Sequence, residues 1–298
     1  MGGPGSERDV SLATGRGVSK ALRSLGAEVV DVDVRDENFA LPKDVDLAFI
    51  TIHGTFGEDG QLQEILEERG VPYTGDAVES SRAAFDKILS KKKFREHNVV
   101  TPEWEVVEVG QQPTILVPLV VKPARQGSTV GVVIVKNASE LDLAMTEAGK
   151  YDRKLLIEKF VPGRELTIGV LGDQALPILE IIPKGGFYDF NNKYPFLNPQ
   201  GGGGAEHVCP AKIDPTRTKQ IQEQALHAFR ALGLVVYGRV DVLLSDSGEP
   251  FVLEVNTIPG MTEASLLPEA AAATGINYVD LCARIIALSR LKTERSRR

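Results

Sequence analysis

Two carboxylates can be brought face to face in the last quarter of the chain. Residues 238–261, GRVDVLLSDSGEPFVLEVNTIPGM, contain two apolar runs on either side of Ser247-Gly248, which predicts a β-hairpin with a two-residue turn. In the register set by that turn, Asp241 lies opposite Glu254. Like charges directly opposite one another destabilise a sheet, so this pair indicates that a cation sits between the two acids.

An arginine and an amide extend the pair. The same register places Arg239 opposite Asn256, and the alternation of side chains puts all four polar residues on one face. The other face then supplies the core, with Val240, Val242, Phe251, Leu253 and Val255. Mg²⁺ uses one or two carboxylates together with nucleotide phosphates, which fits Asp241, Glu254 and Asn256 as ligands. A solvated face on which Arg239 merely neutralises the acids is the alternative.

A lysine followed by a glycine-bearing loop could bind phosphates. Residues 120–133, VVKPARQGSTVGVV, read as a strand that ends in Lys122, a small polar loop and a second strand. The pattern GxxxxGK[ST] of a P-loop is absent, but backbone N–H groups of such a loop can still donate to phosphate oxygens. Lys122 would place a positive charge on the same phosphates. An ordinary polar hairpin loop is the alternative.

A third segment could bind the rest of a nucleotide. The strand-like run LLIEKFVPGRE, residues 155–165, offers backbone groups to an adenine, and its acids Glu158 and Glu165 offer a carboxylate to a ribose. Taken alone, the run is equally consistent with a plain strand. Lys87, in FDKILSKKKF, is one of several lysines on a predicted helix, where a solvated face is the default interpretation.

The elements that must position these residues fall into three segments. The first alternates helical and strand patterns, with helices predicted over 10–25 and 62–68 and buried parallel strands over 28–34 and 47–52. The second and third add these predicted elements: helices over 82–96, 138–148 and 214–233, and strands over 119–122, 132–136 and 155–161. Alternation after residue 165 predicts a largely antiparallel sheet at the end of the chain.

Composition excludes several classes of protein. The chain has 298 residues, 42% hydrophobic and 25% charged, as in a globular protein of about two domains. A net charge of −7 without a basic stripe argues against nucleic acid as a partner, and no apolar run is long enough to cross a membrane or serve as a secretory signal. Two cysteines and four histidines lack metal-ligand or disulfide spacing. We therefore expect a cytoplasmic protein with small-molecule partners.

Taken together, these segments resemble the ATP-grasp superfamily and, within it, the D-alanine–D-alanine ligase family. The resemblance depends on ten segments in the family's order: GGPGSERDVS, HGTFGEDG, PYTG, DK, VKPARQGSTVG, LIEKFVPGRELT, FYDFNNKY, GRVDV, LEVNTIPGMT and SL. It implies a mixed α/β (α+β) fold with a small N-terminal α/β domain over residues 1–82. A central subdomain over 83–163 and a C-terminal subdomain over 164–298 would hold ATP between them.

The resemblance assigns roles to the nucleotide-binding residues. It implies that Lys87 and Lys122 contact the phosphates and that Glu165 holds the ribose. The adenine would be lined by Glu158, Lys159, Phe160 and Val161. Two Mg²⁺ ions, or Mn²⁺, would be bound by Asp241, Glu254 and Asn256, in agreement with the hairpin argument made without the family.

The resemblance also places the first amino acid substrate. Glu7 resembles the acid that pairs with its ammonium group, and His53 matches a residue beside that site. Ser128 and Tyr194 resemble the residues that close the pocket with Glu7, and Lys193 belongs to the same loop. Each has a plainer alternative: Glu7 as a helix N-terminal acid favoured by the macrodipole, His53 as a satisfied structural histidine, and Tyr194 as a loop anchor.

The remaining assignments concern the ligation itself. Arg239 and the Gly260 N–H match an oxyanion-stabilising position, and Ser265 with Leu266 match the site for the second substrate's carboxylate. The implied reaction joins two D-alanines through an acyl phosphate, with ATP as the phosphoryl donor, in the synthesis of a peptidoglycan precursor. A homodimer is expected from the family alone.

Two departures from the family pattern leave alternatives open. Family members carry an apolar strand before the GG motif, whereas here Met1 adjoins that motif. Either the chain start is misplaced or this strand is missing, which would suit a truncated ATP-binding homologue with little activity. Lys193-Tyr194 resembles the dipeptide-forming branch, but residues 198–207, NPQGGGGAEH, differ from the family's shorter loop. D-lactate and D-serine therefore remain alternative second substrates.

Overall fold

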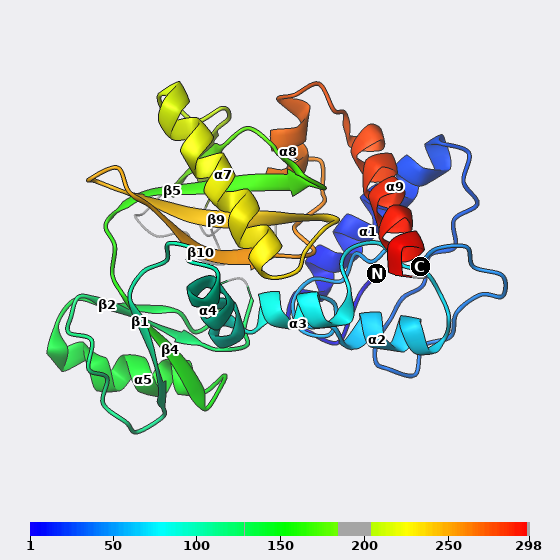
Figure 1. Ribbon diagram of the computed structural model, residues 1–298. Coiled ribbons are helices and arrows are strands. Elements are labelled where there is room, and N and C mark those ends of the chain that lie inside the picture. Colours follow the sequence, from blue (N-terminus) through cyan, green and yellow to red (C-terminus); the bar gives the residue numbers. More distant parts are fainter. Residues whose placement is uncertain (128, 184–203, 297–298) are drawn as a thin grey trace.

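The structure, a computed structural model, describes residues 1–127, 129–183 and 204–296. Figure 1 shows an N-terminal part of helices and extended segments, a central four-stranded sheet and a six-stranded sheet nearer the C-terminus. The predicted residues Ser128, Lys193 and Tyr194 lie outside the described ranges. No described helix is both long enough and apolar enough to span a membrane.

Extended segments and helices make up the N-terminal part. Its helices are α1 (Arg8–Ser24), α2 (Gln61–Glu68) and α3 (Val78–Phe85). Two parallel bridges join its extended segments, Gly2 with Val34 and Ala48 with Tyr73. The predicted strands over 28–34 and 47–52 are thus single bridges rather than ladders. Residues of both segments line a cavity of about 930 Å³, together with Met1.

One long predicted helix is in fact two. The expected helix over 82–96 is broken at Asp86, where α3 ends and α4 (Lys87–Glu96) begins. The backbone of Asp86 is extended, and its side chain accepts hydrogen bonds from the N–H groups of Ile88 and Leu89. A short acidic side chain that caps a helix in this way competes with helix continuation. The break makes Lys87 the first residue of α4.

The central sheet is antiparallel throughout. The elements of this part are β1 (Trp104–Glu108), β2 (Leu119–Pro123), β3 (Val133–Val135), the 3-10 turn η1 (Ala138–Glu140), α5 (Leu141–Gly149) and β4 (Lys154–Lys159). The strands lie in the order β1-β4-β2-β3. Helix α5 covers one face of this sheet (Figure 1). The alternation in β2 buries Leu119 and Val121 against this helix and turns Lys122 to the opposite face, toward the second sheet.

The second sheet is also antiparallel, as predicted. Its order is β10-β9-β5-β7-β8, with β6 beside β5, and its elements are β5 (Gly163–Leu171), β6 (Gln174–Ala175), β7 (Leu179–Pro183), β8 (Ala205–Val208), α7 (Pro215–Ala231), β9 (Tyr237–Ser245), β10 (Pro250–Asn256), α8 (Leu266–Ala272) and α9 (Tyr278–Ser296). Helix α7 lies across one face and buries the main apolar core there (Figure 1). Helix α9 returns to α1, which brings the two ends of the chain together.

The β9–β10 hairpin contains two departures from prediction that cancel. Near its end Leu244 pairs with Pro250, one residue out of the register expected from a two-residue turn, because the chain turns through a longer loop. A bulge between Val252 and Glu254 then restores the expected register, so Asp241 pairs with Glu254. The bulge also changes the core face: Val252 is fully buried, and the expected core residues Phe251 and Leu253 are only partly buried.

Candidate active site

A carboxylate at the centre of the second sheet is held by three neighbours. Thr167 on β5 donates from its hydroxyl to Asp241 Oδ1 at 2.6 Å. Arg239 donates to both oxygens of Asp241, at 2.9 and 2.8 Å, and Asn256 Nδ2 donates to Oδ2 at 3.1 Å. Arg239 and Asp241 are mostly buried, with side chains 12% and 17% exposed, so this is not the solvated face that the sequence left open.

The second acid of the hairpin faces a lysine from α4. Lys87 Nζ lies 3.6 Å from Glu254 Oε2 and donates to the Gln126 carbonyl at 2.5 Å. The Lys87 backbone N–H also donates to the Ala124 carbonyl at 2.9 Å. Helix α4 is thereby tied to the glycine-bearing loop after β2, and the loop is brought over the hairpin acids. Lys87 is therefore not on a solvated face.

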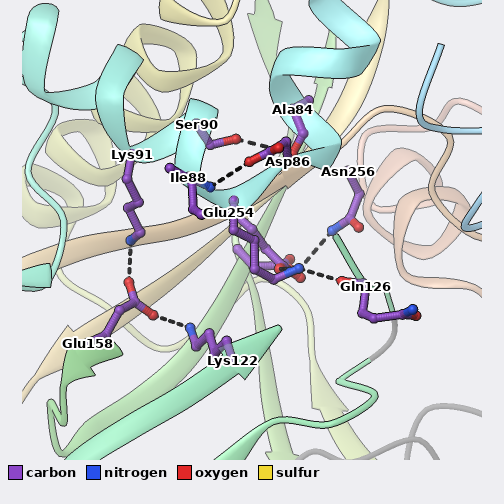
Figure 2. Close-up of polar contacts among 12 residues, drawn as sticks. Ala84, Asp86, Ile88, Ser90, Lys91, Lys122, Gln126, Glu158, Glu254 and Asn256 are labelled. Carbon is purple, nitrogen blue, oxygen red and sulfur yellow. Dashed lines mark hydrogen bonds and ion pairs between the residues drawn. The ribbon is translucent and has the colours of Figure 1, made fainter. Parts of the chain in front are cut away.

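A buried acid lies between two lysines in the central sheet. Glu158 on β4 forms ion pairs with Lys122 on β2 and with Lys91 on α4, and Figure 2 shows it between them. Burial alone would raise the pKa of Glu158, but the positive charges of Lys122 and Lys91 outweigh it and hold this pKa below its usual value. Burial lowers the pKa of Lys122, but the charge and hydrogen bond of Glu158, together with the charges of Glu254 and Glu165, outweigh that effect and raise this pKa.

The predicted adenine edge is partly occupied by the chain itself. Lys159 N–H donates to the Glu103 carbonyl at 2.9 Å, and Phe160 N–H donates to the Pro118 carbonyl at 3.1 Å. Val161 follows the end of β4 and is half-buried. The backbone N–H groups of Lys159 and Phe160 are therefore already used within the fold.

Glu7 lies at the start of α1 but does not cap that helix. Its side chain instead packs against two glycines from other segments. A Cβ atom at Gly54 would lie 2.2 Å from Glu7 Oε2, and one at Gly127 would lie 3.2 Å from it. Only glycine fits at Gly54, which also has a φ of +68°, so the acid contacts both the HGTFGEDG segment and the loop after β2. This geometry argues against the plain helix-terminal role for Glu7.

His53 is held on both ring nitrogens. Nδ1 lies 2.8 Å from the Ile258 carbonyl, and Nε2 lies 2.9 Å from the Thr14 hydroxyl. A carbonyl can only accept, so Nδ1 carries the proton and the neutral ring accepts from Thr14 at Nε2. Burial lowers the pKa of His53, which favours that neutral form. Both ring nitrogens of His53 are therefore satisfied within the fold, and through them the N-terminal part is joined to the segment after β10.

Two functional candidates were not singled out from the sequence. Glu58, inside HGTFGEDG, accepts from the Gly54 N–H at 3.0 Å, and burial together with the negative charge of Glu7 raises its pKa to about 8. The sequence pattern places Lys91 among the lysines of a solvated helix face, yet it is 1% exposed. The spacing of Lys87 and Lys91, four residues apart on one helix face, was the available signal.

The remaining predicted residues lie after β10 and on β5. A Cβ at Gly260 would lie 3.0 Å from Ser265 Oγ, so the two are adjacent. Ser265 precedes α8, and its hydroxyl accepts from the Thr262 N–H at 3.0 Å. Leu266 is buried at the start of α8. Glu165 on β5 pairs with Leu243 of β9, and β9 separates it from Glu254 on β10.

The hairpin residues suit a hard divalent cation. Asp241, Glu254 and Asn256 present carboxylate and amide oxygens, which Mg²⁺ and Mn²⁺ prefer. Within the described part of the chain, no group of three or more His, Cys, Asp or Glu side chains is arranged to hold a metal. Two acids and an amide therefore fit an ion that completes its shell with water and phosphate oxygens, rather than one enclosed by protein alone.

Two antiparallel sheets with facing lysines and acids define the ATP-grasp class of fold. The family described as D-ala D-ala ligase C-terminus matches residues 87–287, and the one described as D-ala D-ala ligase N-terminus matches residues 32–76. The chain belongs to the D-alanine–D-alanine ligase family.

Individual relatives agree over nearly the whole chain. A D-alanine–D-alanine ligase of Methylacidiphilum infernorum is 47% identical over 291 residues, 98% of this chain and 94% of the relative. One from Syntrophotalea carbinolica is 45% identical, covering 98% and 95%. The Bacillus anthracis ligase solved with ATP has a TM-score of 0.85 at 35% identity, covering 99% and 97%. The VanG D-Ala:D-Ser ligase of Enterococcus faecalis also has a TM-score of 0.85, at 27% identity, covering 97% of each chain.

Proposed function

We propose that this protein joins two D-alanines into D-alanyl-D-alanine, with ATP converted to ADP and phosphate, as a step in making a peptidoglycan precursor. The single observation that carries the proposal is the pairing of Asp241 with Glu254, next to Asn256 and within reach of Lys87. Acids and a lysine that converge on one point suit the terminal phosphates of a nucleotide and their metal ions. The family relationship supplies the identity of the substrates.

In the first step the carboxylate of one D-alanine attacks the γ-phosphate of ATP and forms an acyl phosphate. Lys87 and Lys122 bind the phosphates, with Glu165 on the ribose and residues 158–161 along the adenine. Asp241, Glu254 and Asn256 would hold two Mg²⁺ or Mn²⁺ ions, which would neutralise charge on the phosphates. Glu7 holds the ammonium of this D-alanine, its carboxylate placed between Gly54 and Gly127.

In the second step the amine of another D-alanine attacks the acyl carbon, and phosphate leaves. Arg239 and the Gly260 N–H stabilise the oxyanion; one such donor is typically worth about 3 kcal/mol. Ser265 and Leu266 receive the carboxylate of the second substrate. An acyl phosphate hydrolyses readily, so the site must exclude water. We assign this to the loop after β2 with Ser128, and to the segment with Lys193 and Tyr194.

The test measures phosphate release with D-alanine, L-alanine, D-serine and D-lactate, together with the mass of the product. D-alanine alone should give rapid release and a dipeptide mass. A product that contains D-serine or D-lactate in preference would replace the proposal with one of those ligase activities. Absence of turnover with every substrate would support an ATP-binding homologue without activity.

Asp241→Ala and Glu254→Ala test the metal assignment. Each variant should lower the rate of ligation by a factor of about 10³ or more, because a ligand to the phosphate-bound ions is lost. Glu249→Ala, at an exposed acid on the same hairpin, is the matched control and should retain full activity. Full turnover by either site variant would refute the assignment.

We further propose that the enzyme works as a homodimer in the cytoplasm. The dimer follows from the family resemblance, and sedimentation of the purified protein tests it. A monomer at micromolar concentration would rule it out.

A further inference from the structure

Lys91 is a lysine with no access to solvent. It is 1% exposed and forms an ion pair with Glu158, which is equally buried. Lys91 Nζ also donates to the hydroxyl of Thr101, and that hydroxyl donates to the Val252 carbonyl of β10 at 2.7 Å. The ammonium group is therefore held by acceptors from the central sheet and from a segment bound to the second sheet, and it cannot move far from Glu158.

Lys122 is the other counter-ion of Glu158, and its position is different. Its side chain is 13% exposed, whereas that of Lys91 is 1% exposed. In Figure 2 the two lysines approach different oxygens of Glu158, and Gln126, Glu254 and Asn256 lie on the side away from Lys91. Lys122 can therefore turn toward an anion that enters the site, and Lys91 cannot.

Without a second cation, such a movement would be expensive. If Lys122 left Glu158 alone, a fully buried carboxylate would lose its partner, and an unpaired charge in the interior is strongly destabilising. A lysine that is permanently buried beside Glu158 removes most of that cost. A methionine of similar length would fill the same space. Packing alone therefore does not explain why a charged residue is found at position 91.

We propose that Lys91 is a positioning residue: it is the fixed counter-ion of Glu158 that releases Lys122 from Glu158 to the phosphates of the nucleotide. This inference rests on the proposed function, which places Lys122 on those phosphates. Lys91 touches neither the nucleotide nor the amino acids. It acts through Glu158 and through the freedom of Lys122.

Lys91→Met should weaken binding of ATP. Glu158, left with one cation, holds Lys122 more firmly, so we expect the KM for ATP to rise about tenfold. The KM values for D-alanine should change less than about twofold, because no amino acid contact is altered. Lys93→Met is the matched control: Lys93 lies on the same helix, half-exposed, and pairs with Glu96 at the surface. It should leave both KM values unchanged.

The decisive comparison is made in the Glu158→Gln background. A neutral amide does not hold Lys122, so adding Lys91→Met to Glu158→Gln should leave the affinity for ATP unchanged within about twofold. Neither Glu158→Gln nor the double variant has an unpaired buried carboxylate. The two can therefore be compared even if Lys91→Met alone does not fold. An equal loss of ATP affinity in both backgrounds, or a normal KM for ATP in Lys91→Met, would overturn the inference.

Binding of a non-hydrolysable ATP analogue, measured by calorimetry, separates the two proposals. If the unsubstituted enzyme binds the analogue but does not ligate D-alanine, the proposed function fails while the Lys91 series still gives an answer. If ligation proceeds and the Lys91 series shows no dependence on Glu158, the role of Lys91 alone is wrong.

Discussion

At the scale of single residues, Glu7 and Glu58 are two neighbouring acids that cannot both be charged without a cost in free energy. Burial raises the pKa of Glu58, and the negative charge of Glu7 raises it further, to about 8. Glu58 is thus held largely protonated at neutral pH, while its carbonyl oxygen still accepts from the Gly54 N–H. Neutralising one acid of such a pair is the usual result when two carboxyl groups share a site.

This predicts a pH-dependent effect of Glu58→Gln. The pKa of the folded state is above the ordinary value of 4.5, so the stability that Glu58 contributes is fully present below that value. It is lost as the pH rises through about 8. Glutamine resembles the protonated acid, so the melting temperature of the variant relative to the unsubstituted protein should increase between about pH 5 and pH 8.

Thermal melts at several pH values measure this difference. Glu68→Gln, at an exposed acid of α2, serves as the control and should show a difference that does not vary with pH. A constant difference for Glu58→Gln as well would mean that Glu58 titrates normally in the folded protein.

At the scale of elements, the break between α3 and α4 positions a functional lysine. Asp86 caps α4 through the N–H groups of Ile88 and Leu89 and also accepts from Arg125 at 3.0 Å. Lys87 is the next residue, and it reaches Gln126 and Glu254 from the first turn of the helix. A cap that fixes the first turn therefore also fixes the direction of Lys87.

We expect Asp86→Ala to lower the free energy of unfolding by about 1 kcal/mol, as is typical for loss of an N-cap. The KM for ATP should rise as well, because the first turn of α4 frays and Lys87 loses its direction. Asp86→Asn should recover most of the stability, since asparagine caps helices as well as aspartate does. Urea unfolding and steady-state kinetics measure the two effects. If Asp86→Ala is destabilised but its KM for ATP is unchanged, the cap does not determine the direction of Lys87.

At the scale of the whole molecule, a short segment fastens the N-terminal part to the second sheet. Asp76 Oδ1 accepts from the N–H groups of Val235 and Val236, at 2.7 and 3.0 Å, just before β9. Gly75 N–H donates to Ser289 Oγ of α9 at 3.1 Å. Because Glu7 and His53 belong to the N-terminal part and Arg239 belongs to β9, this junction aligns the two halves of the proposed substrate site.

Asp76→Ala should therefore affect both stability and catalysis. Two buried N–H groups lose their acceptor, which should cost about 2–4 kcal/mol in the free energy of unfolding. The KM for D-alanine should rise more than the KM for ATP, since the nucleotide residues lie beyond the junction. Asp76→Asn keeps an acceptor oxygen and should be milder, and Asp173→Ala, at an exposed acid, should be neutral. Normal stability in Asp76→Ala would show that water satisfies these groups.

The sequence by itself determined the chemistry of the hairpin and the antiparallel second sheet. Alternation along a strand depends on neighbouring residues alone, so Asp241, Glu254 and Asn256 could be assigned to one face before any contact was known. Even there, the longer turn and the bulge beside Leu253 were decided by packing, which buries Val252 in place of its neighbours.

Only the tertiary structure decided which lysines of α4 face the acids of the two sheets. Lys87 and Lys91 look like Lys92 and Lys93 in the sequence, and what separates them is Glu158 and Glu254, which lie far along the chain. The same holds for Glu58, whose pKa depends on burial and on Glu7 across the fold. A charge buried by distant segments leaves no local pattern, because its partners become neighbours only when the sheets and helices have packed.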